Sequence, residues 1–346
     1  MAQNQQSKKQ SKGQSKKAKR RAKMSKVLSR CGLKVGLESN PGVYQAPTQV
    51  LKLNSVITPN VEFDSVEIPN FSFYAGAKDV ITIADWGQGS FDVETCFYDN
   101  LDFYSTLFKI CNLKQTADEH GNAVFTPDTH SQNTASVDLI LPDRKFKLQG
   151  AKSNFKLSGQ VGDKINITFG LKAAYNDREM GKNDITDIKS GEALVIRRLG
   201  GMTLNNTPVN LSEFSFDMGC NIGYEKFTNV GEFHISDYEP KLTLKMRLEK
   251  DGADGFDEFK AGTTMSFVAI FRNAEGKDCF KLEIPRAKLS EQPKFSDSDG
   301  IFVIERTFLA IADKGDDNFK LTYIKESNRN KQAEGREQSR EEPSSS

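Results

Sequence analysis

Alternating apolar and polar positions run through most of the chain and predict β-strands. The tripeptide Phe-Lys-Leu occurs four times in such stretches, at Phe146–Leu148, Phe155–Leu157, Phe280–Leu282 and Phe319–Leu321. Because successive side chains of a strand point to opposite faces, each Phe and Leu shares one face and each Lys lies on the other. This pattern is typical of antiparallel sheets with one packed face and one wet face.

The clearest alternation covers Lys241–Glu249, where Leu242, Leu244, Met246 and Leu248 fall on one face. We expect a half-buried strand there. The same criterion predicts further strands at Val61–Ile68, Phe91–Phe97, Val137–Leu141, Ile165–Leu171, Leu211–Met218, Met265–Phe271, Cys279–Ile284 and Ile301–Ile311.

Two segments depart from strand periodicity. Leu101–Cys111 carries large apolar residues at spacings of three and four, which predicts an amphipathic helix of about three turns, with Asp99 or Asn100 as its N-cap. Phe256–Ala261, bounded by two glycines, predicts a shorter helix. The polar stretch Lys114–Thr134, with its Gly and Pro, is expected to be a long loop.

The order of strands and helix is the same in the two halves of the chain. Lys145–Gly150 and Cys279–Ile284 resemble each other, as do Ile165–Tyr175 and Ile301–Ile311. We therefore expect a mainly β protein with a duplicated sandwich-like or barrel-like domain, each copy with one flanking helix. The expected divisions are a disordered arm at 1–30, a first domain at 31–175, a linker at 176–200, a second domain at 201–325 and a disordered tail at 326–346.

The formal charge of +1 conceals a segregation along the chain. Residues 1–30 hold eleven basic residues and no acidic one, which leaves 37 basic and 47 acidic residues, or −10, for residues 31–346. Such an arm binds nucleic acid without sequence preference by releasing counterions, or else remains solvated. Its candidate contacts to nucleic acid or to another subunit are Lys8, Lys9, Lys12, Lys16, Lys17, Lys19, Arg20, Arg21, Lys23 and Lys26.

Cysteine usage and hydropathy limit the class of protein. The five cysteines are an odd number without CxxC spacing, which is typical of reduced, mostly buried residues. Apolar runs stay well below the roughly 20 residues that a spanning helix needs. A charge at Arg30 also interrupts the short apolar stretch that would have to serve as a secretory signal. We expect no membrane partner.

The titratable residues do not form a recognisable catalytic motif. His120, His130 and His234 stand at no metal-ligand spacing, and we expect two solvated loop histidines and one on a sheet surface. The glycines of Gly87–Ser90 lead into a strand, which is the wrong context for a dinucleotide-binding turn. Aspartates around Asp254 and Asp297 lack calcium-loop spacing. We expect no catalytic, cofactor or metal site and no enzyme activity.

The order of segments resembles the tail tube proteins of long-tailed bacteriophages. The resemblance rests on the lead-in Gly36–Gly42, the strand-to-helix unit Phe91–Leu113, the hairpin-like Ser136–Gly159, the strand Lys164–Tyr175 and the segment from Leu211 to Glu249. It covers roughly residues 31–325, and the basic arm and the last twenty residues depart from the usual pattern.

This resemblance implies a structural subunit of the virion tail that forms stacked rings around a DNA conduit. The implied partners are other copies of the chain, the tape measure and tail terminator proteins, and DNA bound without specificity, with assembly in the host cytoplasm. The lead-in at 31–58 and the loop at 114–134 are then expected to reach a neighbouring ring. Two tube-type domains in one chain imply a ring of three copies. The alternative is a nucleic-acid-associated protein whose arm carries the function on a β scaffold.

Overall fold

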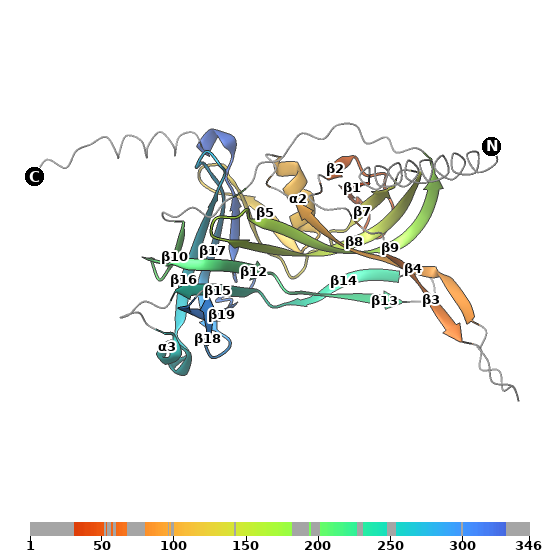
Figure 1. Ribbon diagram of the computed structural model, residues 1–346. Coiled ribbons are helices and arrows are strands. Elements are labelled where there is room, and N and C mark those ends of the chain that lie inside the picture. The colour runs from red at the N-terminus through yellow and green to blue at the C-terminus, as the bar shows by residue number, and fades with distance from the viewer. Residues whose placement is uncertain are drawn as a thin grey trace, which may run out of the picture.

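A computed structural model describes residues 31–51, 53, 57, 60–67, 80–95, 97, 100–141, 143–181, 194, 201–226, 231–247, 254–298 and 300–329. This part of the chain is mainly β, as the alternation predicted, and nearly all its strands join one extended antiparallel sheet system (Figure 1).

Each strand predicted from alternation is present, several are longer than predicted, and further strands occur outside the predicted stretches. Those of the first half are β1 (Gly32–Leu37), β2 (Gln49–Leu51), β3 (Val61–Glu67), β4 (Val80–Thr95), β5 (Leu113–Ala117), β6 (Ala123–Pro127), β7 (Ala135–Ile140), β8 (Arg144–Gln160) and β9 (Asn166–Met180).

The second half contributes eleven further strands to the described part of the chain. They are β10 (Met202–Leu204), β11 (Thr207–Pro208), β12 (Leu211–Asp217), β13 (Cys220–Lys226), β14 (Gly231–Tyr238), β15 (Lys241–Arg247), β16 (Thr264–Arg272), β17 (Asp278–Leu289), β18 (Lys294–Ser298), β19 (Ile301–Ala310) and β20 (Lys320–Tyr323).

Antiparallel pairing sets the order of strands in each half. The first half runs β4–β9–β8–β7–β1–β2. The second half runs β15–β19–β17–β16–β10. Strand β12 joins the two halves, because it pairs with β15 on one side and with the end of β8 on the other.

The hairpin predicted at Ser136–Gly159 is formed by β7 and β8, and the first two Phe-Lys-Leu repeats lie together on β8. A β-bulge separates the repeats at Gly150, whose φ of 62° suits glycine. In a regular strand, Leu148 and Leu157 would point to opposite faces, because they are nine residues apart. The bulge shifts the alternation by one residue, so both side chains are buried in the core.

The long loop predicted at Lys114–Thr134 is wrong. Strands β5 and β6 form a hairpin there, and β6 pairs with β20 of the same chain. Polar side chains on β5 hid its alternation, whereas Ala123, Val124 and Phe125 of β6 are buried against the core. Tertiary packing, rather than local pattern, determines this hairpin.

The predicted long helix is α2 (Leu101–Lys109), and Asn100 caps it by accepting from the backbone N–H groups of Asp102 and Phe103. Its buried face centres on Tyr104, whose ring lies 5.0 Å from the Phe280 ring and 5.9 Å from the Tyr323 ring. Aromatic side chains of both halves thus meet at one helix, and the buried residues form one continuous core.

The shorter helix, α3 (Phe256–Ala261), occupies the predicted residues, and Gly262 ends it with a φ of 63°. The strand before it, β15, buries Leu242, Leu244 and Met246 and turns Thr243 and Lys245 outward. The alternation predicted for Lys241–Glu249 is confirmed over the described residues.

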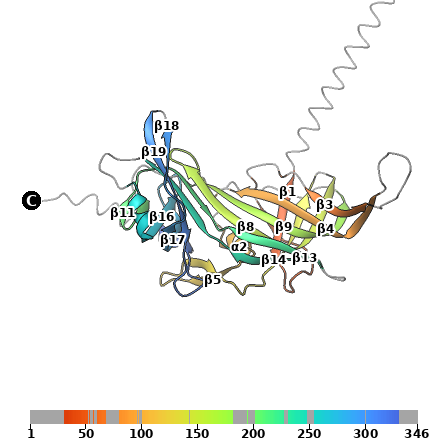
Figure 2. The same ribbon diagram turned by 90° about the horizontal axis from the view of Figure 1, so that it is seen from below.

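Two hairpins lie at opposite ends of the elongated subunit in both views. One is β3–β4 and the other is β18–β19, which lies beside α3 (Figures 1 and 2). A third hairpin, β13–β14, runs alongside β8 and β9 and contacts both.

Three predicted irregular segments are partly ordered within the described residues. β9 extends to Met180, into the predicted linker. Residues 326–329 of the predicted tail form a helical turn, and Arg329 stacks on Phe97 with 5.0 Å between the guanidinium carbon and the ring centre. β1, within the lead-in expected to reach another ring, pairs with β7 of its own chain.

Candidate functional site

The ten cations assigned to the basic arm lie outside the described residues, as does all of the arm. The same is true of Asp251, Asp299 and all residues after Arg329. The functional surfaces of the described part must therefore be found among other residues.

Titratable side chains of the described part do not gather into a metal-binding group. His120 and His130 are exposed in turns, and His234 lies on the surface of β14, as predicted. Cys31, Cys111, Cys220 and Cys279 are free thiols, and burial raises the pKa of Cys111 well above its usual value. Neither helix of this part is long and apolar enough to cross a membrane.

The glycines of Gly87–Ser90 lie inside β4 rather than in a turn. A Cβ added at Gly87 would lie 2.5 Å from the Phe63 ring, and one at Gly89 would lie 3.0 Å from Leu148. Both glycines therefore serve close packing within the sheet.

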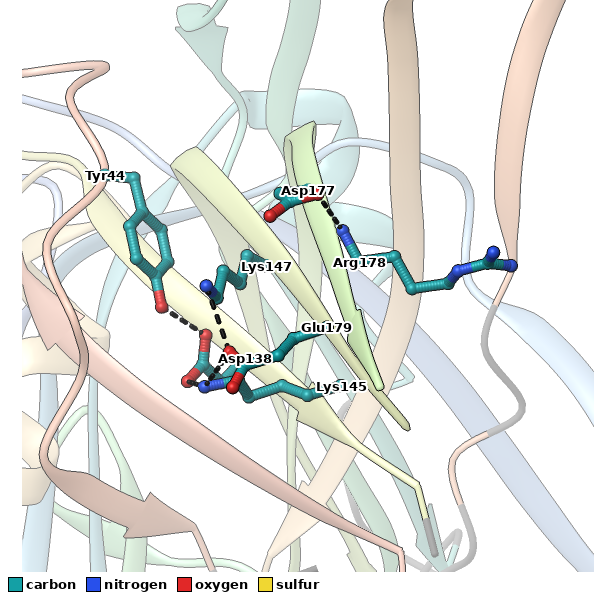
Figure 3. Close-up of polar contacts among 7 residues, drawn as sticks. All are labelled: Tyr44, Asp138, Lys145, Lys147, Asp177, Arg178 and Glu179. Carbon is teal, nitrogen blue, oxygen red and sulfur yellow. Dashed lines mark hydrogen bonds and ion pairs between the residues drawn. The ribbon is translucent and has the colours of Figure 1, made fainter. Parts of the chain in front are cut away.

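A ladder of charged residues crosses β7, β8 and β9 on their outer face (Figure 3). Lys145 lies 3.4 Å from Asp138 of β7 and 3.3 Å from Glu179 of β9, and Lys147 lies 3.0 Å from Glu179. Tyr44, from the segment after β1, donates its hydroxyl to Asp138 at 2.7 Å. The ladder fixes the three strands and the lead-in to one another.

The charges of this ladder compensate one another. Burial alone would lower the pKa of Lys145, but Asp138 and Glu179 outweigh it and raise that pKa. Hydrogen bonds from Lys147 and Lys145 lower the pKa of Glu179. Burial and then the bond to Asp138 raise the pKa of Tyr44, which keeps its hydroxyl protonated as a donor. The arrangement is suited to holding strands together and offers neither a nucleophile nor a proton donor near neutral pH.

Glu38 holds the start of the lead-in against the sheet. Its carboxylate accepts hydrogen bonds from the backbone N–H groups of Gly42 at 2.8 Å and Gly150 at 2.9 Å, and from the hydroxyls of Thr134 at 2.5 Å and Ser136 at 2.8 Å. One side chain thereby joins β7, the bulge of β8 and the turn after β1.

Lys152 is a buried lysine on β8, with 4% of its surface exposed. Its ammonium group donates to Asn112 Oδ1 at 2.9 Å and to the Ser131 carbonyl at 3.5 Å. Burial lowers the pKa of Lys152 to about 8. Strand alternation gives no sign of this burial, because Lys152 lies beyond the bulge and is covered by segments distant in sequence.

A pocket of about 430 Å³ is lined mainly by polar residues of three loops and β14. Asp316 organises it by accepting from the Thr129 hydroxyl at 2.5 Å and the Tyr238 hydroxyl at 3.1 Å. These bonds lower the pKa of Asp316 despite its partial burial. Because the Asp316 carboxylate accepts from Thr129 and Tyr238, which lie in different segments, its bonds tie the loops around the pocket together.

Exposed large apolar side chains concentrate on the two end hairpins. On β3–β4 they are Phe63, Val66, Val80 and Ile81. On β18–β19 they are Phe295, Ile301 and Phe302, with Phe302 70% exposed. Clustered apolar side chains at a sheet end mark sites of protein–protein contact. Sequence alternation missed both clusters, because in each strand these residues look like ordinary members of an apolar face.

Comparison with known families identifies one family for this chain. A family model described as "Phage tail tube protein" matches residues 29–303, which is most of the chain. A search among curated proteins finds no match. This is the same family that the order of segments in the sequence resembles. Members of the family are structural components of the phage virion tail. The chain belongs to the phage tail tube protein family.

Proposed function

We propose that the protein is the self-assembling subunit of a bacteriophage tail tube, in which rings stack to form a conduit for DNA. The observation that carries this proposal is the pair of apolar hairpins at opposite ends of one sheet-based subunit. Head-to-tail contacts between unlike surfaces generate closed rings when the rotation between subunits closes.

Matching strand registers support a duplicated domain, with boundaries at 31–175 and 201–325. In β7–β8, the stretch Ala135–Val137 faces the longer stretch Leu148–Ala151. In β16–β17, Met265–Phe267 faces Ile284–Ala287. The same bulge, with three residues opposite four, thus recurs at the same place in two hairpins.

The remaining pairings extend this correspondence. Two residues after the bulge of β8, Ser153 pairs with Leu171 of β9. Two residues after the bulge of β17, Leu289 pairs with Phe308 of β19, which is the corresponding pair. The order β4–β9–β8–β7–β1 then corresponds to β15–β19–β17–β16–β10 throughout. A chain with two equivalent domains forms a ring of pseudo-sixfold shape from three copies.

The charge distribution supports passage of DNA. The −10 charge of residues 31–346 disfavours adhesion of DNA to the wall, so that the nucleic acid slides. The arm at 1–30 carries the opposite charge and is the segment suited to contact nucleic acid or an acidic neighbouring subunit. Tape measure and tail terminator proteins are the partners inside the tube and at its end, and assembly takes place in the host cytoplasm.

Negative-stain microscopy of the concentrated purified protein tests the proposal directly. We expect rings and stacked tubes. A protein that stays monomeric at high concentration would contradict the tube. Native mass measurement of an isolated ring should give three copies, whereas six copies would show that each chain supplies one elaborated domain.

A further inference from the structure

The register of the two halves gives β18 a defined counterpart. In the first half, Leu157 of β8 pairs with Ile167 of β9. In the second half, Phe295 of β18 pairs with Ile304 of β19, and Ile304 holds the position of Ile167. β18 therefore corresponds to the last five residues of β8, which are Lys156–Gln160.

In the first half, another part of the chain covers this position. β12 pairs with Lys156–Gln160 and sets Phe216 opposite Leu157. The hairpin β13–β14, which follows β12, contacts β8 and β9. As a result, Leu157 is 3% exposed, and Ile165 at the start of β9 is 2% exposed.

The corresponding position in the second half is largely exposed, although the Phe256 ring of α3 stacks on Phe295 with 5.8 Å between ring centres. Within the described residues, β18 pairs with β19 alone. Phe295, which corresponds to Leu157, is 48% exposed, and Phe302, which corresponds to Ile165, is 70% exposed. Phe302 continues the inward-facing series of Ile304 and Phe308, so its exposure reflects a missing cover rather than an outward orientation.

We infer that β18–β19 of one subunit receives the first half of a second copy of this chain, in the way that β8–β9 receives the second half within the chain. Hairpin β3–β4 of the second copy lies on β18–β19 where β13–β14 lies on β8–β9. This inference rests on the proposed function and assigns the contact within its ring. Each subunit offers one donor surface, β3–β4, and one acceptor surface, β18–β19.

The donor hairpin matches its counterpart in form. β3 and β13 have the same length, seven residues, and each is the first strand of a hairpin. β3 leads into β4, which pairs with β9, whereas β13 leads into β14, which is followed by β15, the strand that pairs with β19. Val66 and Ile81 form a cross-strand apolar pair near the end of β3–β4, and they are 54% and 56% exposed. An apolar surface of this kind could cover the exposed side chains of Phe295 and Phe302.

Two variants of the full-length protein test the assignment. The acceptor variant carries Phe295→Asp and Phe302→Asp, and the donor variant carries Val66→Asp and Ile81→Asp. The control is Val161→Asp, because Val161 is also 47% exposed but lies at the β8–β9 turn, where the internal junction is already made. Circular dichroism checks folding, and mass photometry measures the assembly of each protein alone and in mixtures.

Each variant alone should remain monomeric at concentrations where the wild type and Val161→Asp form rings. An equal mixture of the two variants should give a dimer and no larger assembly. The intact donor of the acceptor variant binds the intact acceptor of the donor variant, and the two surfaces left on the dimer are both mutated. Rings from either folded variant, or the absence of the dimer from the mixture, would overturn the inference while leaving the tube proposal standing. A wild type that never assembles would instead contradict the proposed function.

Discussion

Asn154 on β8 donates its side-chain N–H to Asp217 Oδ1 on β12 at 2.8 Å, and its own Oδ1 accepts the backbone N–H of Cys220 at 3.0 Å. This amide links the two halves at the point where β12 joins β8. Asn154→Ala should therefore lower the free energy of unfolding by about 2 kcal/mol, because two partners lose their bonds. Asn176→Ala, at an exposed amide, should cost less than about 0.5 kcal/mol in urea denaturation. Equal losses would contradict a specific role for Asn154.

The inward face of β15 provides a test of the alternation. Leu244 is fully buried, so Leu244→Asp should cost about 4 kcal/mol or more by burying a charge, and it should reduce soluble yield. Lys245 is partly exposed and pairs with Glu213 at 3.1 Å, so Lys245→Asp should cost about 1 kcal/mol. Thermal denaturation compares the two, and similar losses would refute the alternation.

Lys152 should make stability depend on pH above neutrality. Its pKa is about 8 in the folded protein and about 10.4 when unfolded, so between these values the unfolded chain binds more protons. Stability of the wild type relative to Lys152→Met should then rise as pH increases from 8 to 10, by up to about 3 kcal/mol, and stay constant below pH 8. Urea denaturation at several pH values measures this difference, and a flat difference would show that Lys152 titrates normally.

Removal of the Glu38 carboxylate should destabilise the sheet around the bulge of β8. Glu38→Ala removes the acceptor of the Gly150 N–H and the nearer of two acceptors of the Gly42 N–H, which should cost about 3 kcal/mol. The matched change Glu239→Ala removes an exposed ion pair with Lys241 and should cost less than about 0.5 kcal/mol. Hydrogen exchange should locate the loss of Glu38→Ala at β1 and β7, and protection unchanged there would contradict the anchor.

Deletion of residues 1–30 should leave folding intact, because the segment lacks apolar residues able to join a core. The melting temperature should stay within about 2 °C of the full chain. Binding to duplex DNA, measured by fluorescence anisotropy against salt concentration, should lose its steep salt dependence together with the eleven cations. A large loss of stability would mean that the arm is folded, and unchanged binding would place the DNA contact in the body.

Alternation within the sequence was sufficient to predict several of the local elements, but not the β5–β6 hairpin. It located β15, with Leu242 and Leu244 inward, and the three- and four-residue spacing located α2, because both patterns record which side of an element meets the core. The order of these elements also indicated the family. Under the proposed duplication, strand pairing matches Leu282, rather than Phe280, to Phe146, so the match between Phe-Lys-Leu repeats in the sequence is shifted by two residues.

The tertiary structure alone decided which of these faces is covered. Leu157 and Phe295 both lie in short alternating stretches, yet Leu157 is buried under β12 and Phe295 is exposed, because the covering strand comes from another part of the chain. Burial of Lys152 and formation of β5 and β6 likewise depend on segments far away in sequence. A local pattern records the face that a residue occupies, whereas its cover depends on long-range pairing, and within the described residues β18 pairs with β19 alone.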